Sequence, residues 1–338
     1  MLAAIFHGPR DIRVEERPDP EPGAGEAIVR VRAAGICGGD LHEYRAGRQL
    51  YGVPYPRPAQ GHELAGEVVA IGAGVTRVAP GDRVAVMPMV GCGACAFCAA
   101  ARFSLCARLE HIGVARSGGF AERCAVPAAN LYAIPEALPY VEGALLDCTA
   151  VAVHALHRVP VRRGDRVVVL GAGAIGQAVA QAAKAAGGQV TVVGTRATPL
   201  ALARDLGADA VVDLGAGDAP PAGADVVYET AGGPGLLERA AAAAGPEGRI
   251  GLVGESFERA ELDVSQAMSR ELTLAFVWSY DTFEGEDEYA TALELAASGA
   301  VRLEPIVTHR FELESIVEAF ETASDRARSG AVKVIVGG

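Results

Sequence analysis

The sequence predicts an α/β protein with two domains, an antiparallel, barrel-like β domain followed by a doubly wound parallel sheet. The length of 338 residues suggests two domains at about 150 residues each. The pattern of predicted secondary structure also changes near Val151. Before that point, short β-rich runs such as residues 27–31 and 67–71 are separated by Gly and Pro turns, which is typical of a barrel.

From about Val151 strands alternate with helices, which implies right-handed crossovers and parallel strands. The expected strands are 165–170, 189–193, 209–212, 225–228, 249–253 and 272–277, and the expected helices are 174–186, 200–206 and 234–244. After Glu304 the pattern indicates a strand, a helix over 314–323 and a last strand over 331–336. We expect this tail to return to the first domain.

Composition limits the classes of function. Half of the residues are hydrophobic, which excludes a largely disordered chain. The formal net charge of −12 argues against binding to nucleic acid or to an anionic membrane. The run Met1–His7 is too short for a signal-peptide core, and apolar stretches fall short of the ~18 residues of a membrane span. Seven cysteines, four of them between Cys92 and Cys106, suggest a cytoplasmic protein with reduced thiols and a metal.

A glycine-rich turn lies between the first strand of the predicted parallel sheet and the next helix. Gly171 would allow a tight turn, Gly173 the approach of a pyrophosphate, and Gly176 the packing of helix on strand. Ala174 and Ile175 open the helix, whose free N–H groups favour an anion. The turn predicts a dinucleotide site, with a plain turn between core elements as the alternative.

The end of the second strand discriminates between NAD and NADP. NAD enzymes usually place a carboxylate there, whereas this chain has Gly194, Thr195 and Arg196. A hydroxyl and a guanidinium can hold a 2′-phosphate, which a carboxylate would repel. We therefore expect a preference for NADP; the alternative is that Arg196 is a solvated residue that stacks on adenine.

Four cysteines at short spacings, Cys92, Cys95, Cys98 and Cys106, are the strongest local signal. Four thiolates this close can complete a tetrahedral shell, which is the structural type of zinc site. Metal binding would then supply folding free energy to the loop. An iron–sulfur cluster is the alternative.

A second candidate set is dispersed along the chain and consists of Cys37, His62, Glu63 and Asp147. Cysteine, histidine and carboxylate suit zinc, and a site with few protein ligands leaves room for water or substrate. Spacing alone does not distinguish this set from ordinary surface residues.

Taken together, these motifs resemble those of the zinc-dependent medium-chain dehydrogenase/reductase family, in its polyol, threonine and butanediol dehydrogenase branch. The resemblance covers essentially the whole chain. It is carried by residues 35–38 (GICG), 61–67 (GHELAGE), 78–84 (VAPGDRV) and 118–122 (GGFAE), by the four cysteines and by the glycine-rich turn. It implies a GroES-like, partly open β-barrel catalytic domain over residues 1–150 and 300–338, with a zinc lobe around 90–108, and a Rossmann cofactor domain over 151–299.

The resemblance also implies roles for individual residues. Cys37 and His62 would bind a catalytic zinc, and Glu63 would be a ligand or an exchanging near-ligand. Asp147 would lie beside this metal, and Asp40 would orient the ring of His62. The four clustered cysteines would hold a structural zinc.

One departure from the family concerns proton transfer. Relatives usually carry Ser or Thr two residues after the first zinc cysteine, and this chain has Gly39. A relay would then need a water and could continue through His42, for which a plain surface role is the alternative. Cys148, next to Asp147, is either a substitute metal ligand or a core thiol.

The reaction implied is the reversible oxidation of a secondary alcohol to a ketone. Zinc would act as a Lewis acid on the alcohol, and NADP or NAD would carry the hydride. Loops at the carboxyl ends of the strands supply candidate cofactor contacts at Thr230, Ala231, Val253 and Val277. Alternatives are a threonine- or butanediol-type dehydrogenase, or a cofactor-binding relative without catalysis.

A polar and aromatic loop is the candidate substrate contact. It holds Tyr44, Arg45, Arg48, Gln49, Tyr51, Tyr55 and Arg57. These side chains suit a polyol, sugar or cyclitol better than an alkyl alcohol; the alternative is an ordinary surface loop. The family implies a homodimer or homotetramer joined at sheet edges, for which residues 272–277 are the candidate. The expected partners are a small alcohol or ketone, without nucleic acid or membrane.

Overall fold

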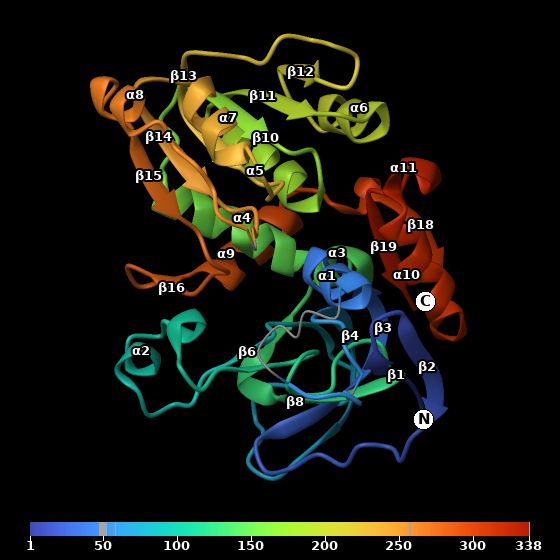
Figure 1. The fold of residues 1–338 in the computed structure, drawn as a ribbon. Helices are drawn as coiled ribbons and strands as arrows, with labels where there is room; N and C mark the ends of the chain where they lie inside the picture. Colours follow the sequence, from blue (N-terminus) through green and yellow to red (C-terminus); the bar gives the residue numbers. More distant parts are fainter. Residues whose placement is uncertain (47–52, 58, 257, 338) are drawn as a thin grey trace. The chain divides into compact units, whose positions relative to one another are not determined.

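The computed structural model describes residues 1–46, 53–57, 59–256 and 258–337 (Figure 1). The chain divides into two compact units, one formed by Met1–Asp147 with Val307–Gly338 and the other by Cys148–Ile306. The boundaries expected at residues 150 and 300 lie close to these limits. The mixed α/β fold class is confirmed.

The first unit is built around a mainly antiparallel sheet in the order β18-β19-β3-β4-β5-β9, with β8 also paired to β3. The strands of this sheet are β3 (Glu26–Gly35), β4 (Glu63–Ile71), β5 (Arg83–Val86), β8 (Arg123–Pro127), β9 (Leu131–Ala133), β18 (Val307–Phe311) and β19 (Lys333–Val336). Two short antiparallel pairs accompany it, β1 (Leu2–Gly8) with β2 (Asp11–Glu16) and β6 (Met89–Val90) with β7 (Glu110–His111). The helices are α1 (Gly38–Ala46), α2 (Ala96–Ala99), α3 (Tyr140–Ala144), α10 (Ile316–Ser324) and α11 (Arg326–Ser329).

The C-terminal helix α10 contributes to the core of this unit. The ring of Phe320 lies 5.4 Å from that of Phe6, 5.2 Å from that of Tyr44 and 5.6 Å from that of Phe120, measured between centroids. All four side chains are almost completely buried. Because aromatic side chains bury large apolar areas, these contacts fix the C-terminal segment to the N-terminal strands.

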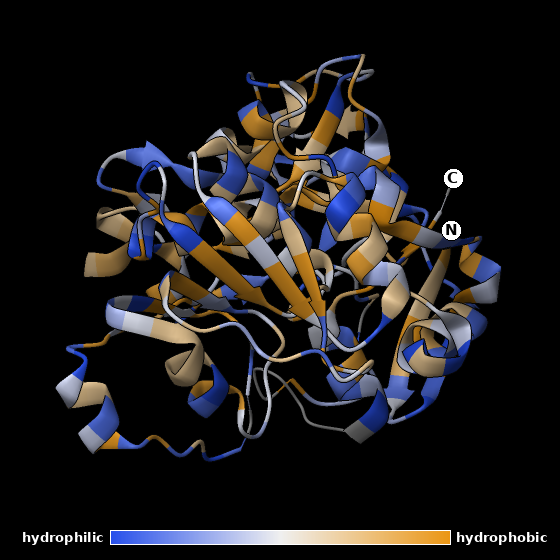
Figure 2. Ribbon diagram, turned by 90° about the horizontal axis from the view of Figure 1, so that it is seen from above, coloured by the Kyte–Doolittle hydropathy of each residue, from blue (hydrophilic) through white to orange (hydrophobic). Residues whose placement is uncertain are grey.

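The second unit contains a parallel sheet in the order β12-β11-β10-β13-β14-β15. Its strands are β10 (Arg166–Leu170), β11 (Gln189–Gly194), β12 (Ala210–Asp213), β13 (Ala224–Glu229), β14 (Ala244–Leu252) and β15 (Thr273–Phe276), and the connecting helices include α5 (Ala174–Ala185), α6 (Ala197–Asp205) and α7 (Leu236–Ala243). The strand order reverses direction next to β10, which makes the sheet doubly wound. Figure 2 shows hydrophobic residues along its strands, as expected for a sheet covered on both faces.

Some elements differ from the expected ones. Helix α6 begins at Ala197 rather than at the expected residue 200. Proline is tolerated in the first turn of a helix, where N–H groups have no helical partner, so Pro199 does not delay the start. The hairpin of β16 (Thr282–Phe283) and β17 (Glu286–Asp287) was not expected, since two-residue strands leave no periodic signal. The remaining helices are α4 (Leu146–Arg158), α8 (Val264–Ser269) and α9 (Glu288–Ala297). In the described part of the chain, helices fall short of the length and apolarity needed to cross a membrane.

Candidate metal centres and cofactor site

Cys37, His62 and Glu63 come together where β3 and β4 meet. Cys37 follows β3, and Glu63 is the first residue of β4 and the register partner of Gly35. One ligand atom from each of the three side chains lies within 4.8 Å of the others. Glu63 is buried, whereas Cys37 and His62 keep partial access to solvent. The antiparallel pairing thus brings together residues that are distant in the sequence.

Asp40, on α1, lies next to this group. Its Oδ2 accepts a hydrogen bond from the N–H of Cys37 at 2.9 Å, and its Oδ1 lies 3.8 Å from Nδ1 of His62. The second contact is too long for a hydrogen bond. Burial raises the pKa of Asp40 to about 6, partly offset by His62 and by the N–H of Cys37.

Negative charge gathers around His62. Burial by itself lowers the pKa of this imidazole, but Cys37, Asp40 and Asp147 raise it well above its ordinary value. Asp147 therefore acts on the site through its charge, although it lies outside the group of atoms within 4.8 Å. Nδ1 of His62 is buried and has no hydrogen-bond partner among the described residues. Thiolate, imidazole and carboxylate are a zinc donor set, so the residues present fit a zinc ion.

Two residues without a ligand-like spacing also reach this site. The ring of His111 on β7 lies 5.1 Å from that of His62 and nearly perpendicular to it, and burial lowers the pKa of His111 to about 3. Nζ of Lys333 on β19 forms a buried ion pair with Glu63 and donates a hydrogen bond to the carbonyl of Ile36 at 3.1 Å. The Lys333 contact depends on the pairing of β19 with β3, and the His111 contact on the packing of segments far apart in the sequence, and residue spacing reveals neither.

The loop proposed to contact substrate is placed differently from the expectation. Tyr44 belongs to the core beside Phe320. Arg57 is also buried, and its Nη1 donates a hydrogen bond to Oε2 of Glu43 at 2.9 Å. The interpretation of Tyr44 and Arg57 as substrate contacts was therefore wrong, because a buried carboxylate and an aromatic cluster already engage them.

The other loop positions remain predictions. Tyr55 is half-buried and donates its hydroxyl to Oε1 of Glu43 at 2.9 Å. Arg45 is exposed and bonds the carbonyl of Ser324. His42, the candidate relay residue, is exposed on α1. Arg48, Gln49 and Tyr51 lie outside the described residues.

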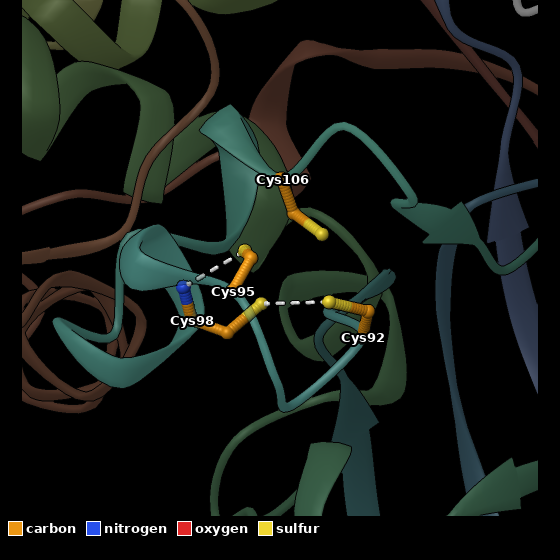
Figure 3. A group of neighbouring side chains, drawn as sticks. All are labelled: Cys92, Cys95, Cys98 and Cys106. Atoms are coloured by element: carbon orange, nitrogen blue, oxygen red, sulfur yellow. Dashed lines mark hydrogen bonds between the residues drawn. The ribbon is translucent and has the colours of Figure 1, made fainter.

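Four cysteine side chains point toward a common centre in the lobe around α2 (Figure 3). Sγ of Cys92 lies 3.9 Å from Sγ of Cys98, and the N–H of Cys98 donates to Sγ of Cys95 at 3.4 Å. Cys106 completes the group, whose sulfur atoms lie within 4.8 Å of one another. All seven cysteines lie in the described part of the chain, and none forms a disulfide. The set fits an all-sulfur zinc site.

The glycine-rich turn has the geometry of a dinucleotide site. Gly171 has a φ of +111°, which favours glycine, and a β-carbon at Gly176 would overlap the carbonyl oxygen of Gly171. A β-carbon at Gly173, by contrast, would meet open space, which leaves room for a ligand. The hydroxyl of Thr230 donates to the carbonyls of Leu170 at 3.0 Å and Gly171 at 3.1 Å, so it holds the turn in place. Ala174 and Ile175 begin α5 as expected.

The residues after β11 carry no carboxylate. Gly194 ends the strand, Thr195 is exposed, and Arg196 precedes α6 half-buried, which lowers the pKa of its guanidinium. Asp213, the register partner of Gly194 on β12, accepts hydrogen bonds from the N–H groups of Gly215 at 2.9 Å and Ala216 at 3.2 Å. Its carboxylate is therefore engaged in its own turn.

The other candidate cofactor contacts lie at the carboxyl ends of neighbouring strands. The N–H of Ala231 donates to Oε1 of Glu229 at 2.7 Å, and the N–H of Val253 to the carbonyl of Glu229 at 2.8 Å. Val277 follows β15, and its N–H donates to the carbonyl of Leu252 at 2.9 Å. In an open parallel sheet this edge is where ligands bind.

Comparison with known proteins identifies the class. A family model of the alcohol dehydrogenase GroES-like domain matches residues 23–136, and one of the zinc-binding dehydrogenases matches residues 174–298. The chain is 33% identical to sorbitol dehydrogenase of Bacillus subtilis (strain 168), covering 99% of this chain and 97% of that protein. It is 32% identical to galactitol 1-phosphate 5-dehydrogenase of Escherichia coli (strain K12), covering 96% of each. A Sinorhizobium meliloti 1021 protein crystallised with NADP superimposes with a TM-score of 0.91 at 32% identity, covering 100% and 99% of the two chains.

The fold and the site therefore define a zinc-binding dehydrogenase. The chain belongs to the zinc-dependent medium-chain dehydrogenase/reductase family, in its polyol dehydrogenase branch. It is an NAD(P)-dependent zinc alcohol dehydrogenase.

Proposed function

We propose that this enzyme oxidises a secondary alcohol group of a polyol, sugar or cyclitol reversibly to the ketone, with NADP favoured over NAD and two zinc ions per chain. The observation that carries the proposal is the convergence of Cys37, His62 and Glu63 within 4.8 Å, separate from the four-cysteine group. The relatives named for sorbitol and galactitol 1-phosphate support the polyol class.

Cys37, His62 and Glu63 would hold the catalytic zinc, with Asp147 close enough to act through its charge. When bound, this ion supplies Lewis-acid stabilisation for the alcohol oxygen as its proton leaves. Asp40 holds the backbone of Cys37 and, at 3.8 Å from His62, favours one orientation of the ring. Gly39 offers no hydroxyl, so the proton passes through solvent toward exposed His42 on the same helix.

Gly173 and the N-terminus of α5 would hold the pyrophosphate, and Thr195 and Arg196 the 2′-phosphate of NADP. The S. meliloti protein bound to NADP supports this assignment. Thr230, Ala231, Val253 and Val277 would line the nicotinamide end through the loops that carry them. When bound, the cofactor would supply the hydride acceptor, and these residues would align it with the carbon to be oxidised.

The four cysteines would hold the second, structural zinc. The lobe has little apolar core, since α2 carries no buried residue and only Ser104 and Cys106 are buried nearby. The metal would therefore supply much of its folding free energy.

The test combines metal analysis with initial rates. We would measure zinc per chain and rates of cofactor reduction with NADP and NAD across polyols, cyclitols, threonine and simple secondary alcohols. Cys37→Ser should lose one zinc and turnover while the four-cysteine zinc stays. Cys124→Ser, at a buried cysteine outside both groups, is the matched control. Retained turnover in Cys37→Ser would refute the assigned site, and turnover restricted to threonine or butanediol would refute the substrate class.

A further inference from the structure

The chain uses lysine at only two positions. Among its 30 basic residues, 28 are arginines and the lysines are Lys184 and Lys333. Lys184 is partly exposed and pairs with Asp209 at 2.8 Å, in the second unit. Lys333 is 4% exposed and lies in the first unit, beside the candidate catalytic metal site. A buried lysine in a chain that otherwise uses arginine calls for a physical reason.

Strand pairing brings Lys333 to this site. Ile335 on β19 is the register partner of Gly35 on β3, and the N–H of Ile36 donates to the carbonyl of Val334 at 3.1 Å. Lys333 therefore lies next to the segment that leads from β3 to Cys37. Its Nζ donates to the carbonyl of Ile36 and forms the ion pair with Oε2 of Glu63.

The space around this ion pair is small. A β-carbon at Gly35 would overlap Oε2 of Glu63 and lie 3.0 Å from Cε of Lys333. A lysine ammonium is a compact point charge, whereas a guanidinium is a broad planar fork. The absence of a side chain at Gly35 makes room for the carboxylate of Glu63, and the compact ammonium of Lys333 fits beside it.

We propose that Lys333 competes with the catalytic zinc for the carboxylate of Glu63, and that it thereby sets how much Glu63 acts as a metal ligand. This inference rests on the proposed zinc site of Cys37, His62 and Glu63. Lys333 is thus a positioning residue, which acts on the metal through Glu63.

The physical basis is that the carboxylate of Glu63 pairs with Lys333 and also belongs to the group of Cys37 and His62, where a bound metal would be a second cation. A buried carboxylate without a counter-charge is unfavourable, so Glu63 stays paired in either arrangement. Pairing with Lys333 would leave Glu63 off the metal, so that substrate could bind there. Pairing with the metal would make Glu63 a further ligand and help to retain the ion when no substrate is bound. Removal of the lysine charge should leave Glu63 on the metal.

The first experiment examines the wild-type protein by NMR with 13C-labelled lysine. Only two lysine Cε signals are expected, and Lys184→Met assigns them by removing one. Addition of zinc to the metal-free protein should shift the Lys333 signal and leave that of Lys184 in place. In Glu63→Gln the zinc-induced shift should be lost, because no ion pair exists to be broken. An unmoved Lys333 signal, or an equal shift in Glu63→Gln, would overturn the proposal.

The second experiment uses Lys333→Met, with Lys184→Met as the matched control. Co(II) is placed in the catalytic site with zinc kept in the four-cysteine lobe, and imidazole is titrated while the visible Co(II) bands are recorded. With Glu63 held on the metal, imidazole should bind about tenfold more weakly in Lys333→Met, and a chelator should remove zinc about tenfold more slowly. Lys333→Arg should restore the values only in part. Wild-type values in Lys333→Met would overturn the proposal.

The outcomes separate this inference from the proposed function. If Cys37→Ser keeps both zinc ions, the proposed metal site is wrong and the inference fails with it. Suppose instead that Cys37→Ser loses one zinc while the zinc-induced shift of Lys333 is the same in Glu63→Gln and imidazole binding is unchanged in Lys333→Met. In that case only the inference fails. If Lys333→Met does not fold, the wild-type NMR comparison still decides.

Discussion

At the scale of single residues, Arg196 carries the predicted cofactor preference. Its guanidinium is half-buried before α6, and no carboxylate stands at the end of β11. Since hydrogen bonds to charged groups contribute about 1.5–3 kcal/mol, Arg196→Ala should weaken NADP binding about 10- to 100-fold and NAD binding little. Fluorescence titration with both reduced cofactors measures this ratio. Arg204→Ala, an exposed change on the same helix, is the control. An unchanged NADP-to-NAD ratio would favour the alternative of a solvated Arg196.

Gly35 is a second residue whose substitution has a defined consequence. A β-carbon there would overlap Oε2 of Glu63, and both residues are held by the pairing of β3 with β4. Gly35→Ala should therefore displace the carboxylate, lower the zinc affinity of the catalytic site about tenfold or more, and leave the four-cysteine zinc in place. Zinc retained per chain after dialysis against a weak chelator tests this. Gly38→Ala, where a β-carbon meets open space, should behave as wild type; equal losses in both variants would contradict the prediction.

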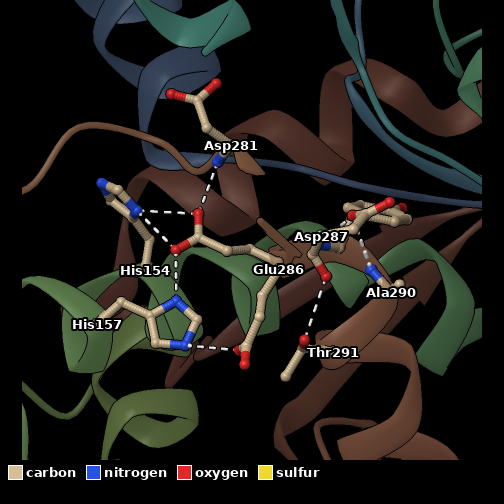
Figure 4. A network of polar contacts seen from close by, with 9 residues as sticks. His154, His157, Asp281, Glu286, Asp287, Ala290 and Thr291 are labelled. Carbon is tan, nitrogen blue, oxygen red and sulfur yellow. Dashed lines mark hydrogen bonds and ion pairs between the residues drawn. The ribbon is translucent and has the colours of Figure 1, made fainter. Parts of the chain in front are cut away.

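At the scale of elements, a buried carboxylate joins α4 to the β16–β17 hairpin and α9 (Figure 4). Glu288 is fully buried at the start of α9 and accepts hydrogen bonds from Nδ1 of His154 at 2.9 Å and of His157 at 2.7 Å. The N–H of Asp281 donates to its other oxygen at 2.6 Å. Nε2 of His157 also lies 3.6 Å from Glu286. The network therefore ties the hairpin and the start of α9 to α4 through one carboxylate.

The network makes stability depend on pH. The hydrogen bond to Glu288 raises the pKa of His157 above its ordinary 6.5, and the two histidines lower the pKa of Glu288 below its ordinary 4.5 despite burial. The histidine contribution is complete below pH 6.5 and is lost as pH rises through the raised pKa. The glutamate contribution is present above pH 4.5 and is lost as pH falls through the lowered pKa. Both contributions are therefore present between these values.

His157→Gln should consequently cost about 1.5–3 kcal/mol of stability at pH 6, the range of a hydrogen bond to a charged group, and less at pH 9. Urea unfolding at the two pH values measures the difference, and hydrogen exchange of residues 281–289 locates it. His309→Gln, on β18 in the other unit, is the control. A loss that is the same at both pH values would show that His157 acts through packing on Phe283 rather than through its charge.

At the scale of the whole molecule, the sequence predicts best those elements and sites whose residues lie close together along the chain. Residues 167–170 of β10 form one apolar run, and Cys92, Cys95 and Cys98 lie within seven consecutive residues, so both are visible in the sequence. Contacts made by strand pairing are not visible. His111 and Lys333 reach the catalytic group through β7 and β19 and carry no spacing signal.

The same limitation explains the error at Tyr44 and Arg57. Polar and aromatic residues in a loop resemble a substrate-binding surface when their partners are unknown. The structure supplies those partners, Phe320 for Tyr44 and Glu43 for Arg57, from elements that the loop sequence does not specify. Residue types identify a chemistry, whereas the fold decides which of them remain available for it.

The open edge of the parallel sheet predicts how copies of this chain assemble. Among the described residues β15 pairs with β14 on one side, and Phe276 at its end is 74% exposed, with Trp278 next to it 47% exposed. An apolar edge strand is a template for pairing with another chain, and the family resemblance implies assembly at this edge. We therefore propose that the chain forms a homodimer, or a homotetramer built from such dimers, joined through β15.

Phe276→Asp should place a charge in this interface and convert dimers to monomers at micromolar concentration, as measured by size-exclusion chromatography with light scattering. The exposed control Phe97→Asp lies on the four-cysteine lobe in the first unit and should leave the dimer intact. A metal content and a far-UV spectrum equal to wild type would show that the separated chains stay folded. A dimer that survives Phe276→Asp but not Phe97→Asp would place the interface on the lobe instead.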